Sequence, residues 1–210
     1  MTNKSVPDVV IKRLPRYYRY LGDLMDQGIF RISSANLSKK MNVTASQIRQ
    51  DFNYFGGFGQ QGYGYNVEYL YNTIGEILGV NKGNTTIIIG AGNLGHALAS
   101  HTGFARRGFE LVGIFDNNKD IIGTTINNMK VMSIDKLDEF LSKNKVDIAI
   151  LSVPKVAVQS VAQTVANCGV RGILNFSYRE LELPEDIMVE NIHISDPLMT
   201  LSYKIKRGEK

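Results

Sequence analysis

The 210-residue chain has a single cysteine, three histidines and no tryptophan. A disulfide needs two cysteines, so none can form within the chain, which fits a reducing compartment. The histidines are scattered without the spacing of metal ligands, and we therefore expect no metal site. No apolar run approaches the roughly 20 residues of a membrane span, and the first residues lack the apolar core of a signal peptide. These absences predict a cytoplasmic protein with neither a membrane nor a metal partner.

Positive charge is concentrated near the N-terminus. The formal net charge of the chain is +4. Residues 1–66 contain nine basic and four acidic side chains, so this part carries the whole excess and the remainder is close to neutral. A polyanion partner would therefore bind in the N-terminal part, and a solvated basic face is the alternative.

A capped helix is predicted to begin after Thr44. Thr44-Ala-Ser-Gln47 has the form of a capping box, in which the threonine accepts a hydrogen bond from the third helical amide and the glutamine reaches back to the cap. Ile48, Phe52 and Phe55 recur at helical spacing and define the buried stripe. At about 100° per residue, the side chains that face away from this stripe or flank it are Ser46, Gln47, Arg49, Gln50 and Asn53.

The outward face of this helix carries hydroxyl, amide and guanidinium groups, which read base edges and hold phosphates in the major groove of DNA. Earlier helical patterns, from Val9 to Met25 and around Leu37 and Met41, complete a helix-turn-helix, and residues 58–65 have the glycines and aromatics of a hairpin wing. A small three-helix module without nucleic acid is the alternative. Besides the outward face, the DNA-binding candidates are Thr44 at the cap and Gln60, Gln61 and Tyr63 in the wing.

A glycine-rich loop follows a short buried strand at residues 87–89. Gly90-Ala91-Gly92-Asn93-Leu94-Gly95 is a G-x-G-x-x-G motif between this strand and a helical pattern. In such a loop the first glycine makes the tight turn, the second lets backbone amides approach a pyrophosphate, and the third lets helix and strand pack closely. His96 follows directly and is a further candidate for ligand contact.

A second apolar run ends in Asp116, 21 positions after Gly95. A carboxylate at this distance accepts hydrogen bonds from the adenosine ribose and repels a 2′-phosphate, so the sequence favours NAD(H) over NADP(H). A nucleotide-fold relic, or a site for another adenine ligand, is the alternative. Ser152-Val153-Pro154 closes a later buried strand at the edge where nucleotide pockets lie. Its backbone either borders the ribose or nicotinamide of the ligand, or the proline merely ends the strand.

The pattern after Asp116 alternates between short strands and helices, as in a doubly wound α/β fold. A polar, glycine-containing linker at residues 81–84 predicts the domain boundary. The last helix, with Leu198, Leu201 and Ile205 on one face, packs either on its own chain or on a partner subunit. We therefore expect a winged-helix DNA-binding domain over residues 1–80, a Rossmann domain over 81–195 and a C-terminal helix over 196–210.

Three functions can be weighed against this arrangement of a DNA-binding segment and a dinucleotide pocket. A redox sensor would combine a DNA-binding domain with a dinucleotide-binding pocket. A small NAD-dependent oxidoreductase would need a substrate domain with a general acid or base over the nicotinamide, and the chain leaves no segment for one. A constitutive DNA-binding protein with a structural nucleotide differs from the sensor only in its response to the ligand, and the residues do not separate those two.

Seven motifs follow one another along the chain: Arg13-Leu-Pro-Arg-Tyr-Tyr-Arg19, the segment 43–52, Tyr54-Phe-Gly-Gly-Phe-Gly59, Gly62-Tyr-Gly-Tyr65, the glycine loop, Ser152-Val-Pro154 and Ile173-Leu-Asn-Phe176. In these motifs and their order, the chain resembles the Rex family of bacterial redox-sensing repressors over nearly its whole length. The resemblance implies a homodimer that exchanges its C-terminal helices, is not an enzyme, binds an inverted-repeat operator, and releases it when NADH replaces NAD. It also marks two switch candidates: Arg19, and His101, which stands where many relatives have a tyrosine near the nicotinamide.

Overall fold

The computed structural model describes residues 6–56, 59–60 and 63–208, with only the backbone of residues 59 and 60. The chain forms two compact units that divide between Lys82 and Gly83. None of the helices in the described part is both long and apolar enough to cross a bilayer.

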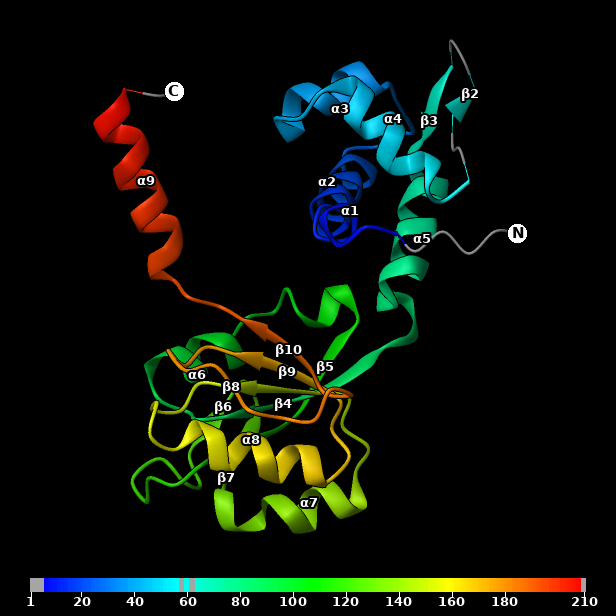
Figure 1. Ribbon diagram of the computed structural model, residues 1–210. Helices are drawn as coiled ribbons and strands as arrows, with labels where there is room; N and C mark the ends of the chain where they lie inside the picture. The colour runs from blue at the N-terminus through cyan, green and yellow to red at the C-terminus, as the bar shows by residue number, and fades with distance from the viewer. Residues whose placement is uncertain (1–5, 57–58, 61–62, 209–210) are drawn as a thin grey trace. The chain divides into compact units, whose positions relative to one another are not determined.

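The first unit is a helical bundle with a small antiparallel sheet (Figure 1). Side chains start three of its helices, because Ser33, Thr44 and Asn66 each accept a hydrogen bond from the backbone amide three residues on. The sheet order is β1-β3-β2, which places a wing after the helix-turn-helix. Its elements are α1 (Asp8–Ile11), α2 (Leu14–Asp26), β1 (Arg31–Ile32), α3 (Ser34–Met41), α4 (Ala45–Asn53), β2 (Gly59–Gln60), β3 (Gly64–Asn66) and α5 (Val67–Leu78).

Two local details differ from expectation. The first helical pattern is divided, since α1 ends at Ile11 and α2 begins at Leu14, with Pro15 in its first turn, where a missing N–H is tolerated. The capped helix α4 ends at Asn53, so Phe55 packs against the core from the turn that follows rather than from the helix. The buried stripe of α4 therefore comprises Ile48 and Phe52.

The second unit is a seven-stranded sheet in the order β10-β9-β8-β4-β5-β7-β6, parallel except for β6. The run β7-β5-β4-β8-β9-β10 is the strand order of a dinucleotide-binding Rossmann fold. Its strands are β4 (Asn84–Ile89), β5 (Phe109–Asp116), β6 (Thr125–Ile126), β7 (Met129–Ser133), β8 (Ile148–Leu151), β9 (Gly172–Asn175) and β10 (Met188–Asn191); its helices are α6 (Asn93–Ala99), α7 (Leu137–Lys143), α8 (Val158–Asn167) and α9 (Ser195–Arg207).

The two faces of this sheet are covered unequally. Ile87 and Ile89 of β4 point to the face where α7 and α8 bury a large core (Figure 1). Ile88 points to the opposite face, where a smaller core forms with α6. On that second face a hollow of about 310 Å³ extends from β4 over β8, β9 and β10. Apart from Glu190, Thr86 and Gly172, its lining is apolar: Phe104, Phe109, Ile148, Ile150, Ile173, Leu174 and Met188.

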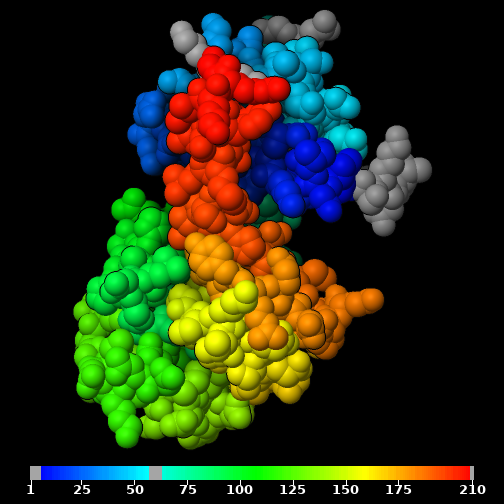
Figure 2. Space-filling view, turned by 60° about the vertical axis from the view of Figure 1, so that its left-hand side comes forward, coloured from blue at the N-terminus to red at the C-terminus, as the bar shows by residue number. Residues whose placement is uncertain are grey.

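The C-terminal helix α9 buries none of its residues. Its apolar side chains, coloured red with the rest of α9 in the space-filling view of Figure 2, stand in solvent: Leu198, Met199, Leu201, Tyr203 and Ile205. An apolar helix side left in water is unfavourable. A helix was expected here, and the structure extends it from Ser195 to Arg207.

Candidate functional site

The glycine loop connects β4 to α6 by a turn that admits no side chain at two positions. Gly90 has φ +97°, and a Cβ on it would lie 2.5 Å from the carbonyl oxygen of Ser152. A Cβ on Gly95 would lie 1.8 Å from the carbonyl oxygen of Gly90. A Cβ on Gly92, in contrast, would meet no atom within 4 Å. The loop therefore has no room for a side chain at the first and third glycines, whereas free space adjoins the second.

A hollow of about 420 Å³ lies at the carboxyl ends of β4, β5 and β8. β4 pairs with β5 on one edge and with β8 on the other, so the strand order reverses direction at β4. Ligands of open α/β sheets bind at such a topological switch point. Six predicted residues line the hollow: Gly90, Gly92, Asp116, Ser152, Val153 and Pro154. Residues that were not predicted complete the lining: Ile89, Asn117, Asn118, Ile121, Ile134, Ala157 and Val161.

Asp116 ends β5 inside this hollow, with 9% of its surface exposed. Its Oδ2 accepts a hydrogen bond of 2.6 Å from the amide of Ala91, and its Oδ1 accepts one of 2.7 Å from the amide of Asn118. Each carboxylate oxygen has two lone pairs, so one on each remains for a ligand hydroxyl. Asp116 thus ties the glycine loop to the end of β5 and keeps acceptor capacity toward the hollow.

The glycine loop and Asp116 fit the adenosine end of a dinucleotide. The space at Gly92 suits a pyrophosphate, and no side chain caps the amides of α6 that follow Gly92. Of the other predicted contacts, Ala91 donates to Asp116, and Gly95 is buried beneath the loop. Asn93, Leu94 and His96 occupy the first turn of α6 and do not line the hollow.

Neither of the two switch candidates lines this hollow. His101 is exposed just after α6, packs edge-on against Phe104 at a ring distance of 5.0 Å, and lines a separate hollow of about 190 Å³. Arg19 is an exposed residue of α2. Asn175, which ends β9, and Ser177 just after it are buried and hydrogen-bonded to each other, and neither lines the hollow.

In the first unit, α4 presents polar side chains to solvent beside its buried stripe. Thr44, Ser46, Arg49, Gln50 and Asn53 are all exposed. The Arg49 guanidinium donates a hydrogen bond of 3.1 Å to the hydroxyl of Ser34, at the start of α3, so the arginine is held over the neighbouring helix. Of the wing candidates, Tyr63 is 71% exposed, Gln60 lies in β2, and Gln61 lies outside the described residues.

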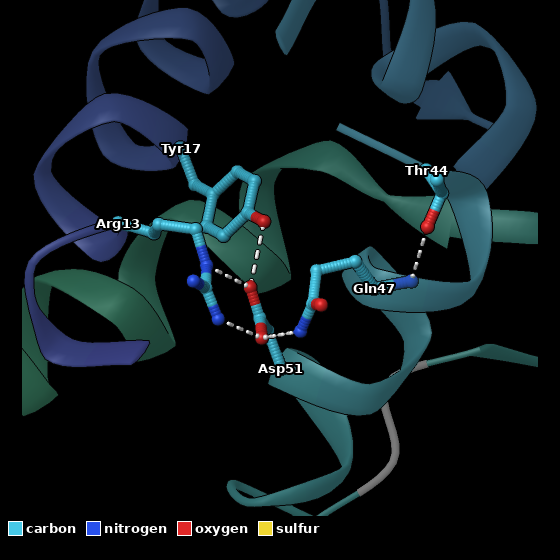
Figure 3. Close-up of polar contacts among 5 residues, drawn as sticks. All are labelled: Arg13, Tyr17, Thr44, Gln47 and Asp51. Carbon is cyan, nitrogen blue, oxygen red and sulfur yellow. Dashed lines mark hydrogen bonds and ion pairs between the residues drawn. The ribbon is translucent and has the colours of Figure 1, made fainter. Parts of the chain in front are cut away.

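Gln47 differs from the other predicted DNA contacts. The Thr44 hydroxyl accepts from the Gln47 amide at 3.1 Å, as a capping box requires, but the glutamine side chain does not reach back to the cap. Its Nε2 donates instead to Asp51 Oδ1 at 2.9 Å (Figure 3). Gln47 is half-buried, and this contact turns its side chain toward the interior of the unit.

Asp51 is a fully buried carboxylate that sequence reasoning missed. The Nε and a terminal nitrogen of Arg13 each donate to it at 2.7 Å, and the Tyr17 hydroxyl donates at 2.8 Å (Figure 3). Burial alone would raise the pKa of Asp51, but the hydrogen bonds from Arg13, Gln47 and Tyr17 hold that pKa below its ordinary value. The sequence did contain a signal for this buried carboxylate, because Asp51 lies three residues after Ile48 and next to Phe52, within the apolar stripe of the helix.

Comparisons with known proteins cover both units. Residues 5–53 match the family described as "Putative DNA-binding protein N-terminus", and residues 81–178 match the "CoA binding domain" family. The chain is 51% identical over its whole length to the redox-sensing transcriptional repressor Rex of Thermoanaerobacter sp. (strain X514), of which it covers 94%. It is 49% identical to the protein of the same name from Clostridioides difficile (strain 630), with 99% of each chain covered.

Two solved structures share the fold of the whole chain. The crystal structure of RSP in complex with β-NAD+ and operator DNA gives a TM-score of 0.90 at 50% identity, covering 98% of this chain and 95% of that one. The structure of RSP with β-NADH gives 0.89 at 48% identity, covering 98% and 97%.

Proposed function

Because the chain belongs to the Rex family of redox-sensing transcriptional repressors, we propose that its first unit binds the operator and its second unit binds NAD(H). The chain is a DNA-binding repressor that senses NADH, and it is not an enzyme. NAD(H) is therefore a sensed ligand rather than a hydride carrier in turnover. We assign residues 1–80 to a winged-helix DNA-binding domain, 81–195 to a Rossmann domain and 196–210 to a helix exchanged in a homodimer.

The NAD(H) assignment depends above all on Asp116, which shares one hollow with the glycine loop. Its free acceptor positions suit the ribose hydroxyls of the adenosine, and its charge opposes a 2′-phosphate. Val153 and Pro154 line the same hollow and are assigned to the remainder of the dinucleotide. The backbone of residues 91–96, including Ala91, Asn93, Leu94, Gly95 and His96, is assigned to the pyrophosphate side.

The DNA assignment rests on the exposed polar face of α4, which we call the recognition helix. Arg49, Gln50, Ser46 and Asn53 supply the donors and acceptors that read base edges, and Thr44 lies at the helix start, where phosphate contacts are common. We assign Gln60, Gln61 and Tyr63 of the wing to the DNA backbone or minor groove. The excess of basic residues in this unit adds attraction to the phosphates.

The homodimer assignment is supported by two apolar surfaces that the chain leaves open. Parallel sheets are normally covered on both faces, yet one face over β8, β9 and β10 forms an apolar hollow. The apolar side of α9 has no partner among the described residues of its own chain, since none of its residues is buried. A second copy would supply cover for both surfaces and would give two DNA-binding units for an inverted-repeat operator.

Ligand control requires that NADH and NAD differ in affinity for the DNA-competent arrangement. The two ligands differ in the charge and shape of the nicotinamide ring, so the discriminating contacts belong to that end. We assign the response to His101, which lines a different hollow from Asp116, and to Arg19 in the first unit. A protein that acts on operator DNA works in the cytoplasm of a bacterium, which is where we place it.

One titration tests this proposal. Fluorescence anisotropy of a labelled operator duplex would be measured with the full-length protein at saturating NAD and at saturating NADH. A coupling of about 1–3 kcal/mol predicts that NADH weakens operator binding by about 5- to 150-fold. If NADH is bound, as nicotinamide fluorescence would show, and operator affinity changes by less than twofold, the protein is a constitutive DNA-binding protein with a structural nucleotide.

A further inference from the structure

The recognition helix α4 is joined to α2 through one buried carboxylate. Asp51 of α4 accepts four hydrogen bonds: two from Arg13 at the start of α2, one from Tyr17 a turn later in α2, and one from Gln47 in α4 (Figure 3). The Asp51 side chain has no exposed surface, whereas the Arg13 side chain is 25% exposed. The carboxylate of Asp51 is therefore enclosed by the protein, whereas the guanidinium of Arg13 that pairs with it reaches the surface.

We propose that Asp51 is a positioning residue for operator recognition, and that Gln47 is a support for Asp51 rather than a reader of bases. Burial of apolar groups, such as the Tyr17 ring against Phe52, is non-directional and does not by itself fix how one helix is rotated against another. A guanidinium fork on a carboxylate fixes distance and orientation together. The contact between the Arg13 guanidinium and the Asp51 carboxylate thus fixes the rotation of α4 about its axis. That rotation determines the direction in which the side chains of Ser46, Arg49 and Gln50 point.

This role differs from stabilisation of the fold. A buried ion pair loses much of its Coulomb energy to desolvation, so an apolar core of the same shape is often as stable. A reader of base edges, in contrast, loses hydrogen bonds when its donors shift by a fraction of an ångström. The pair is consequently expected to matter more for the distinction between operator and other DNA than for folding.

The proposal rests on α4 being the DNA-reading helix, and the first experiment separates the two ideas. The full-length protein would be compared with Asp51→Asn on an operator duplex selected by the protein from random DNA and on an unrelated duplex, by fluorescence anisotropy. Removing a negative charge by itself strengthens binding to any DNA. Mispositioning predicts the opposite for the operator alone: a loss of at least about tenfold, on the order of one good bidentate base contact, with unrelated DNA bound as well as before or better.

Matched variants serve as controls. Asp23→Asn removes the same charge from an exposed site on α2 and should leave both affinities within twofold. Arg13→Lys keeps the positive charge but loses the two-pronged guanidinium contact, so it should weaken operator binding as Asp51→Asn does. The double variant Arg13→Lys/Asp51→Asn should bind the operator no more weakly than the weaker-binding of the two single variants. Arg49→Ala should lose operator binding whatever the fate of Asp51; if it does not, the assignment of α4 to DNA fails and the Asp51 proposal fails with it.

Gln47→Ala distinguishes support from base reading, and it is informative even if Asp51→Asn does not fold. On a panel of operators with single base-pair changes, a supporting glutamine predicts a similar loss for every sequence. A base-reading glutamine predicts relaxed discrimination at one base pair and little change elsewhere, and that pattern would overturn its role here. Folded Asp51→Asn and Arg13→Lys proteins with wild-type operator affinity would overturn the positioning role of Asp51.

Discussion

Replacing Asp116 with alanine is expected to narrow the preference of the protein for NADH over NADPH. In the structure the carboxylate lines the hollow at the glycine loop and has acceptor capacity left after its bonds to the Ala91 and Asn118 amides. NADH loses a charge-assisted hydrogen bond in the variant. NADPH loses the repulsion between the carboxylate and its 2′-phosphate. The two dissociation constants therefore move toward each other.

The magnitude follows from the bonds that disappear. A hydrogen bond to a charged group contributes about 1.5–3 kcal/mol, so NADH binding should weaken by about 10- to 150-fold. The same substitution leaves the buried amide of Ala91 without its acceptor, which costs about 1–3 kcal/mol of stability. The ratio of the NADPH and NADH dissociation constants should fall at least about tenfold, and the unfolding temperature of the ligand-free protein should decrease.

Isothermal titration calorimetry with both dinucleotides gives the ratio directly. Asp120→Ala is the matched control, because Asp120 is exposed and lies outside the lining of the hollow, so it removes the same charge without these contacts. Asp116→Asn keeps one acceptor oxygen and should lose less NADH affinity than the alanine variant. A wild-type preference for NADPH, or an unchanged ratio in Asp116→Ala, would refute the assignment of this carboxylate to the ribose.

Arg49→Ala should weaken operator binding by about 1–3 kcal/mol, as expected for a good charged base contact; unchanged anisotropy with an intact circular dichroism spectrum would exclude α4 as the reader. Gly95→Ala should abolish NADH binding, because its Cβ would overlap the Gly90 carbonyl, and DNA binding without ligand should persist; NADH titration of the variant at wild-type affinity would contradict this. Leu201→Asp places a charge on the apolar side of α9 and should shift the protein to a monomer in sedimentation experiments; an unchanged dimer would mean that α9 is not at the interface. The lowered pKa of Asp51 means that its contribution to stability is present above the unfolded-state pKa of about 4 and is lost as the pH falls through the lower folded-state value. Asp51→Asn should therefore flatten the acid side of the stability profile, and equal acid sensitivity in denaturant titrations would argue against the charged pair.

Features encoded within a few residues could be predicted from the sequence. The cap at Thr44 is confirmed, because a hydroxyl and an amide three residues apart need no other part of the chain. The strand at 87–89 and the glycine loop behind it are likewise local, and both are present.

Features that depend on distant residues were missed. Arg13 and Asp51 are separated by 38 positions, and helical periodicity carries no information on which arginine meets a buried aspartate. The bond from Ala91 to Asp116 spans 25 positions and appears only once β4 and β5 are paired. One local feature was also missed, the hairpin of β6 and β7. It turns on Asn127 and Asn128, both at positive φ, and glycine is the usual second residue of such a turn, so the sequence signal was weak.

The homodimer proposed for the apolar sheet face and α9 would make the stability of the repressor depend on its own concentration. If both surfaces are covered only by a second molecule, part of the free energy of folding comes from association and scales with protein concentration. Dilution then lowers the unfolding temperature and exposes apolar surface that invites aggregation or proteolysis. In that case a cell that makes too little of the protein would lose repression faster than in proportion to the shortfall, because subunits at low concentration would also be less stable.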